Sequence, residues 1–117
     1  MQADDKSFDI NACLSDIEQS ITEIYDFISS ENDFLKFSAD KKSKKAVERN
    51  IEIIGEAMDR ILKTDPGFPI SNSRKIVDTR NRIIHGYDSV SADVLWLIIT
   101  RFLPVLEREV KDLLKKH

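Results

Sequence analysis

The segment RNRIIHGYD, residues 80–88, gathers side chains that could carry out chemistry. Arg80, Asn81, His85 and Tyr87 lie within this one short stretch. A guanidinium can hold two phosphate oxygens in a fork, and an imidazole can accept or donate a proton near neutral pH. These residue types therefore suit work on a phosphate group, and that work needs no metal ion.

The spacing of these residues decides whether one helix could bring them together. Asn81 and His85 are four positions apart, so they would lie on nearly the same face of a helix. Arg80 precedes His85 by five positions, roughly 140° around the axis at ~100° per residue. A rigid helix would not join the two, but arginine is long and Gly86 can turn the chain. A shared site is feasible, and so is an ordinary solvated helix end with Tyr87 as an edge aromatic.

The elements that must position this segment are expected to be helical. Apolar residues recur at spacings of three and four, the period of one helix face, and no segment shows the alternation of a half-buried strand. The two clearest stripes are Ile10, Leu14, Ile17, Ile21, Ile24 and Ile28, then Val47, Ile51, Ile54, Met58 and Ile61. Ser7 or Asp9 could cap the first helix, and the second should run from about Asp40 to about Lys63.

Two connections flank the second helix. ENDFLKF, residues 31–37, should form a short apolar turn that packs Phe34, Leu35 and Phe37 against the main helices. TDPGFPI, residues 64–70, contains two prolines and a glycine and should end the second helix. Because this loop is short, the next helix should fold back beside the second.

The third helix should carry the reactive segment at its carboxyl end. Ser71 or Ser73 can begin it, and Gly86 suits the left-handed residue that closes a helix. Its apolar positions are Ile76, Val77, Ile83 and Ile84. The reactive residues would therefore stand where the helix gives way to a turn.

The last helix should begin near one of two possible caps, Asp88 or Ser91. Its apolar residues cover more than one face, which together with Trp96 suggests burial against a second chain as well as the core. Pro104 should bend this helix, because proline cannot donate a hydrogen bond to the carbonyl of Thr100. We expect this additional apolar surface to be covered by a second chain.

The predicted architecture is an all-α bundle of four main helices with short connections, in a single domain over residues 1–117. A net charge of −3 argues against gripping nucleic acid by bulk electrostatics. Positive charge is concentrated locally, in KKSKK at residues 41–45 and in Arg74, Lys75, Arg80 and Arg82. Taken alone, KKSKK is typical of a solvated, lysine-rich helix start.

Neither a disulfide nor a membrane anchor is expected. Cys13 is the only cysteine, which excludes an internal disulfide and a cysteine-based metal site, and its place on an apolar stripe suggests that it fills the core. The amino terminus lacks a secretory signal, and no window is long and apolar enough to cross a bilayer. We expect a soluble, cytoplasmic protein.

A family resemblance adds to this reading. Arg80, His85 and Tyr87 match the signature R-x4-H-x-Y, within the longer run IVDTRNRIIHGY. VERNIEIIGEAMDRI, residues 47–61, also resembles the preceding helix of the same family. Together these motifs are similar to the HEPN superfamily, specifically the HepT-like toxin ribonucleases. The resemblance implies a four-to-five-helix bundle with antiparallel main helices, and a dimer that brings two copies of the motif to a cleft.

The activity implied by the resemblance is metal-independent RNA cleavage without a cofactor. His85 would act as acid or base, Arg80 would bind and stabilise the scissile phosphate, and Asn81 would support them. Attack by a ribose 2′-hydroxyl would leave a 2′,3′-cyclic phosphate, and DNA would resist. The RNA-binding candidates are Arg74, Lys75 and Arg82, contributed by two subunits.

The resemblance also implies a partner, a minimal nucleotidyltransferase antitoxin that neutralises the toxin by adenylylating Tyr87. A nucleotide two residues from His85 would occupy the phosphate site and repel RNA. A packing or RNA-stacking role for Tyr87 remains the alternative. In one departure from the family, the segment TDPGFPISNSRKI, residues 64–76, lacks a tryptophan often found before the third helix.

A different class of function also fits the residues. In that reading the protein is a noncatalytic helical module in which Arg80 and His85 bind a nucleotide or the substrate of a nucleotidyltransferase. Substitution of those two residues would separate the readings, because only the enzyme would lose RNA cleavage.

Overall fold

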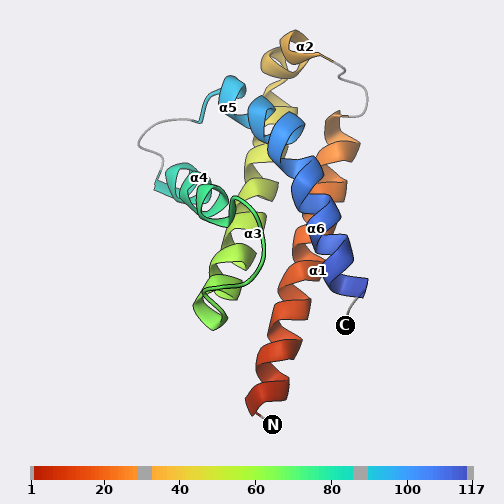
Figure 1. The fold of residues 1–117 in the computed structure, drawn as a ribbon. Coiled ribbons are helices and arrows are strands. Elements are labelled where there is room, and N and C mark those ends of the chain that lie inside the picture. The colour runs from red at the N-terminus through yellow and green to blue at the C-terminus, as the bar shows by residue number, and fades with distance from the viewer. Residues whose placement is uncertain (1, 29–32, 86–89, 116–117) are drawn as a thin grey trace.

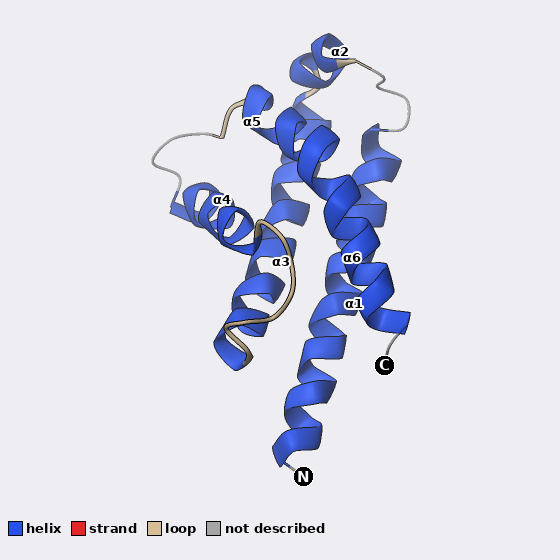
Figure 2. Ribbon diagram, in the orientation of Figure 1, coloured by secondary structure: helices blue, strands red, loops and turns tan. Residues whose placement is uncertain are grey.

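A computed structural model describes residues 2–28, 33–85 and 90–115 of the chain. Every regular element in these ranges is helical, as Figure 2 shows, so the predicted all-α class is confirmed. The elements are α1 (Gln2–Ile28), α2 (Phe34–Ala39), α3 (Lys41–Thr64), α4 (Ser73–His85), α5 (Ala92–Leu97), the π-helical turn η1 (Ile98–Phe102) and α6 (Leu103–Lys115). Within the same ranges, no helix is long and apolar enough to cross a membrane.

Three long helices form the body of the bundle. In Figure 1, α1 and α3 lie side by side in opposite directions, and α6 packs along α1. The short helix α2 lies at one end, against α3 and α5. Helix α4 was expected to fold back beside α3. It does contact α3, but its axis crosses that of α3 and does not run alongside it.

The two predicted apolar stripes form the centre of the core. Leu14, Ile17 and Ile24 of α1 are fully buried, and so are Val47, Met58 and Ile61 of α3. Leu103, Leu106 and Val110 bring α6 into the same cluster. Each stripe makes one face of its helix apolar, and the helices pack together because these faces are buried against one another. The three-and-four spacing therefore accounts for the bundle.

Side chains cap several helix starts. Asp40 caps α3, where its Oδ1 accepts hydrogen bonds from the backbone N–H of Lys42 at 3.0 Å and of Ser43 at 3.2 Å. Ser91 caps α5, as the sequence allowed. The expected start of α1 was wrong: the helix begins at Gln2, so positions 7 and 9 lie inside it.

The short apolar segment before α3 packs through two of its three large residues. Phe37 of α2 is fully buried, and its ring centroid lies 5.3 Å from that of Trp96 on α5. Phe34 contacts the same tryptophan at 6.4 Å. Leu35 was wrongly expected to pack here; it is 76% exposed, because a six-residue helix buries only one face. Trp96, which was expected to help bury its helix against a second chain, thus packs on α2 of its own chain. The neighbouring large residue Leu97 is exposed.

Pro104 lies just after a change of helix type. The backbone N–H of Leu103 donates to the carbonyl of Ile98, the five-residue spacing of a π turn. Proline has no N–H for the carbonyl of Thr100, and the wider turn takes up this break in the hydrogen-bond ladder. The hydroxyl of Thr100 donates to the carbonyl of Trp96 at 2.8 Å. The structure thus shows a π turn just before Pro104, and the bend expected at this proline stays a prediction.

Candidate active site on α4

Arg80 lies in the middle of the apolar face of α4. At ~100° per residue, Ile76 and Ile83 fall on one side of it and Val77 and Ile84 on the other. Ile76 and Val77 are buried against α3, and Ile83 is half-buried. The aliphatic stem of Arg80 consequently points toward α3.

Gly55 of α3 makes room for this arginine. A Cβ atom at position 55 would overlap Arg80 Cβ, lie 2.8 Å from Arg80 Cγ and lie 3.2 Å from the backbone carbonyl of Ile76. No larger residue fits there without moving α4. The glycine of the IEIIGEA segment is thus explained by a close approach of the two helices.

The guanidinium of Arg80 leaves this packed position toward solvent. Its Nε is buried and has no hydrogen-bond partner among the described residues. Its Nη1 donates to Asn81 Oδ1 at 3.0 Å, and Asn81 is exposed. The stem is therefore held in the α3–α4 interface while the charged end reaches the next face of α4.

His85 is the final residue of α4 and is exposed. It lies one turn after Asn81, so Asn81 and His85 share the face that the guanidinium reaches. The structure brings Arg80 and Asn81 together by a hydrogen bond, and the meeting of Arg80 with His85 stays a prediction. Gly86 and Tyr87 lie outside the described residues, so the roles assigned to them stay predictions as well.

The three RNA-binding candidates, Arg74, Lys75 and Arg82, are all exposed. Helical geometry places them on the polar half of α4, the half that carries His85. Lys75 and Arg82, together with the carboxylate of Asp78, are the charged residues lining a groove of about 290 Å³ between α4 and the α5–η1 segment. The ammonium of Lys75 lies 5.5 Å from the ring centroid of Phe102, where the ring face attracts a cation.

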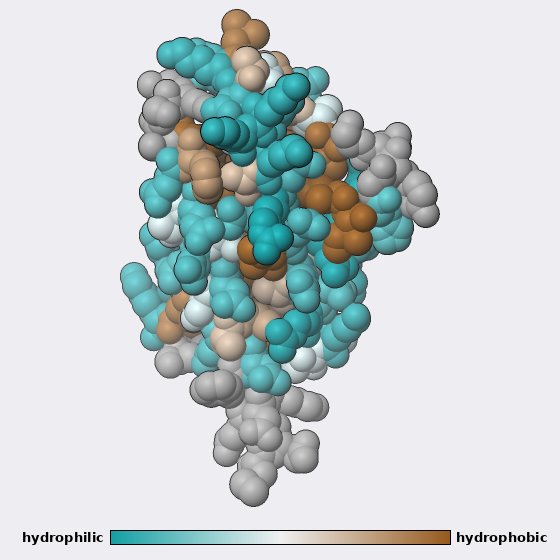
Figure 3. All heavy atoms as spheres, turned by 180° about the vertical axis from the view of Figure 1, so that it is seen from behind, coloured by the Kyte–Doolittle hydropathy of each residue, from teal (hydrophilic) through white to brown (hydrophobic). Residues whose placement is uncertain are grey.

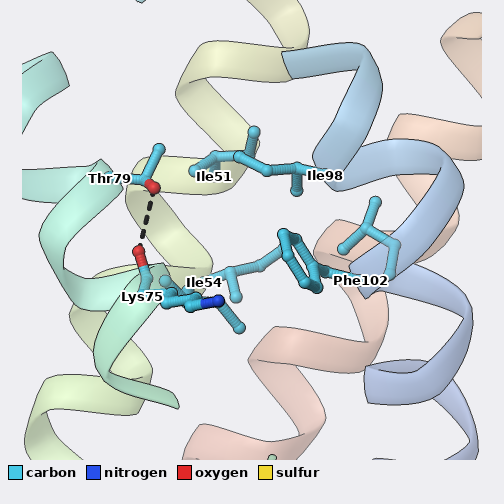
Figure 4. Close-up of a pocket in the computed structure, with 8 residues that line it drawn as sticks. Ile51, Ile54, Lys75, Thr79, Ile98 and Phe102 are labelled. Carbon is cyan, nitrogen blue, oxygen red and sulfur yellow. Dashed lines mark hydrogen bonds between the residues drawn. The ribbon is translucent and has the colours of Figure 1, made fainter. Parts of the chain in front are cut away.

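A second pocket, which shares Lys75, Thr79, Ile98 and Phe102 with the groove, is lined mostly by apolar side chains from α3, α4 and η1. The residues labelled in Figure 4 are Ile51, Ile54, Lys75, Thr79, Ile98 and Phe102. The hydroxyl of Thr79 is engaged with the carbonyl of Lys75 at 2.9 Å. This second pocket measures about 30 Å³, space for at most a water or two.

The other residues that the sequence singled out, Cys13 and the KKSKK run, do not belong to the α4 site. Within the described ranges, no three His, Cys, Asp or Glu side chains come together so as to hold a metal ion. Cys13 is buried in the core, and burial raises the pKa of its thiol although Arg60 opposes the shift. Lys41, Lys42 and Lys45 of the KKSKK run are exposed at the start of α3, as expected of a solvated helix start.

Sequence reasoning missed Gly55 as part of the site. The signal was present, because a charged residue stands at the centre of an otherwise apolar face of α4. Such a residue needs a space on the opposite helix that admits its stem. Pairing it with the lone glycine of α3 required knowledge of which helix α4 crosses.

Comparisons with known proteins identify the family of the chain. The sequence model of a family described as "Ribonuclease HepT-like" matches residues 17–113. A "Putative RNase" of Methanocaldococcus jannaschii is 30% identical over 111 residues, covering 92% of this chain and 88% of the relative. A "Probable ribonuclease HepT" of Thermococcus cleftensis is 35% identical over 106 residues, covering 87% and 93%. No solved structure matches. The chain belongs to the HepT-like family of the HEPN superfamily.

Proposed function

We propose that this protein is a ribonuclease toxin that cleaves RNA without a metal ion at the α4 site. The observation that carries the proposal is the hydrogen bond that presents the Arg80 guanidinium on the face of Asn81 and His85. Family membership supports it, because relatives such as that of Thermococcus cleftensis carry the name ribonuclease.

The proposed chemistry uses the ribose as the nucleophile. The 2′-hydroxyl attacks the adjacent phosphorus as its proton leaves, the bond to the 5′-oxygen breaks, and that oxygen gains a proton. His85 transfers a proton at the attacking or the leaving oxygen, and Arg80 stabilises the charge that grows on the phosphoryl oxygens. The products are a 2′,3′-cyclic phosphate and a free 5′-hydroxyl, and DNA is resistant because it lacks the nucleophile.

The RNA would be held by the cationic half of α4. Arg74, Lys75 and Arg82 are exposed there, and the net charge of −3 leaves the affinity to such local groups. Lys75 and Arg82 line the groove that a strand could follow.

A homodimer would place two such faces at one cleft. Ile84, next to His85, is 47% exposed, and Leu97 of α5 is 46% exposed. Figure 3, which views the molecule from behind, shows hydrophobic surface at the edge of the molecule where α4 lies. Exposed apolar residues flanking a charged site favour burial against a second copy.

The main test is RNA cleavage in EDTA by the wild-type protein and by His85→Ala, Arg80→Ala and Arg108→Ala. Arg108 is an exposed arginine of α6 and serves as the matched control. We expect cleavage by the wild type and the control, and a loss of about 100-fold or more in the other two. RNA cleavage that survives both the His85→Ala and the Arg80→Ala substitution would disprove the proposal that this protein is a ribonuclease acting through the α4 site. RNA binding without cleavage would instead favour the noncatalytic module.

Control by an antitoxin completes the proposal. A cognate minimal nucleotidyltransferase would transfer adenylate to the hydroxyl of Tyr87, releasing pyrophosphate from ATP. Incubation with that enzyme and ATP should add one or more adenylates to the mass and abolish cleavage, and Tyr87→Phe should accept none. Tyr25→Phe is the control, because it removes the other tyrosine. Adenylylation that persists in Tyr87→Phe would refute this assignment.

A further inference from the structure

Glycine at position 55 needs a reason, because glycine weakens a helix interior relative to alanine. Gly55 lies within α3 and is buried. The place of a side chain there is taken by Cβ and Cγ of Arg80, the two atoms that a methyl group at this position would meet first. The space is therefore occupied by the stem of the one charged residue on that face of α4.

Packing of the stem limits where the guanidinium can go. Cβ and Cγ are held against α3, and Nε is buried behind them without a partner among the described residues. Only the outer end is bonded, through Nη1 to Asn81 Oδ1 at 3.0 Å. The position of the arginine stem is thus fixed by the space that Gly55 leaves free, and the position of the guanidinium is fixed by its hydrogen bond to Asn81.

We infer that Gly55 is a positioning residue for the Arg80 guanidinium, an inference that rests on the proposed ribonuclease function. A methyl group at position 55 displaces α4 or rotates the arginine stem, and either change moves the guanidinium relative to Asn81 and His85. Small errors in the placement of a group that stabilises a transition state cost rate more than ground-state binding.

The variant Gly55→Ala tests this inference, with Gly67→Ala as the matched control. A Cβ at Gly67 would meet only Asp65 Oδ1 at 3.8 Å, an ordinary contact. With a short RNA substrate we expect kcat of Gly55→Ala to fall about 10- to 100-fold while KM changes less than about threefold. Gly67→Ala should match the wild type. Equal kcat in folded Gly55→Ala and wild type would overturn the inference.

A second readout needs no RNA. The Nε–Hε NMR resonance of Arg80, assigned by its loss in Arg80→Lys, reports on the buried end of the guanidinium. It should shift in Gly55→Ala and stay in place in Gly67→Ala. An unshifted resonance in folded Gly55→Ala overturns the inference whatever the RNA assay shows. Lack of cleavage by the wild type together with a shifted resonance would refute the proposed ribonuclease and leave the positioning intact.

If Gly55→Ala fails to fold, the contact is tested through stability. Arg80→Gly removes the Cβ and Cγ that a methyl at position 55 would overlap. The melting temperature of the double variant Gly55→Ala/Arg80→Gly is then compared with that of Arg80→Gly alone, and recovery of folding in the double variant is the expected result. Alanine at position 55 should be far better tolerated beside glycine at position 80 than beside arginine. An equal penalty in both backgrounds would show that another contact requires Gly55.

Discussion

An arginine at the centre of an apolar helix face must satisfy packing and solvation at once. Arg80 does so by dividing its side chain, with the stem against Gly55 and the charged end at Asn81. The long aliphatic part of arginine makes this division possible, whereas a shorter polar residue would be trapped in the interface. At the residue scale, the site is thus an arginine whose direction is set by two neighbours.

Asn81 should matter through that hydrogen bond. Asn81→Ala removes the acceptor for Arg80 Nη1, and hydrogen bonds to charged groups contribute about 1.5–3 kcal/mol. We expect kcat for RNA cleavage to fall about 10- to 100-fold, since 1.4 kcal/mol corresponds to about tenfold. Gln19→Ala, which removes an exposed amide on α1, is the control and should retain full activity. Full activity of Asn81→Ala would show that the hydrogen bond between Asn81 and Arg80 does not contribute to RNA cleavage.

The buried thiol should make stability depend on alkaline pH. Burial raises the pKa of Cys13 above its ordinary value of 9.0, so the folded protein keeps a proton that the unfolded chain releases. The free energy of unfolding should therefore fall as pH rises above about 9, because the folded state then binds more protons. Urea denaturation at pH 8 and pH 10 measures the decrease, which should be smaller in Cys13→Ala. An equal decrease in both proteins would contradict this cause.

At the scale of elements, the helices are attached by very unequal numbers of buried side chains. The short helix α2 is attached mainly through Phe37, which packs on Trp96 of α5. Helix α4 is attached through Ile76, Val77 and the Arg80–Gly55 contact. The π turn before Pro104 keeps α5 and α6 in one continuous path, so α5 can reach both α2 and the groove beside α4.

Phe37 and Leu35 provide a matched pair for the attachment of α2. Phe37→Ala should lower the free energy of unfolding by about 3–5 kcal/mol, because it leaves a cavity at a fully buried position. Leu35→Ala should change it by less than about 0.5 kcal/mol, because Leu35 is 76% exposed. Chemical denaturation measures both. A similar loss for the two variants would mean that Leu35 is covered in solution.

At the scale of the whole molecule, the exposed apolar residues beside the site lead to a prediction about assembly. Leu97→Glu or Ile84→Glu should convert a dimer to a monomer, because each would bury a charge in the proposed interface. Leu35→Glu is the control, as Leu35 is still more exposed but lies on α2. Light scattering after size exclusion gives the mass. A dimer that survives both substitutions on the α4–α5 side would place the interface elsewhere.

Much of the fold could be predicted because its causes are local. The stripes of α1 and α3 and the stop before Pro66 each arise within a few neighbouring residues. The errors fell where local signals compete. Ser7 and Asp9 are good caps, but the helix continues past them to Gln2. Leu35 is apolar, but the helix that carries it buries one face only.

The sequence by itself determined the helical class, the family and the residue types gathered near the end of α4, because periodicity, caps and motifs are properties of neighbouring positions. Only the tertiary structure decided that α4 crosses α3 at Gly55, and so that the stem of Arg80 is buried while its guanidinium reaches Asn81. The physical reason is that two residues distant in the chain share one small space there. Which pair shares it depends on how the helices cross, and no local pattern encodes that angle.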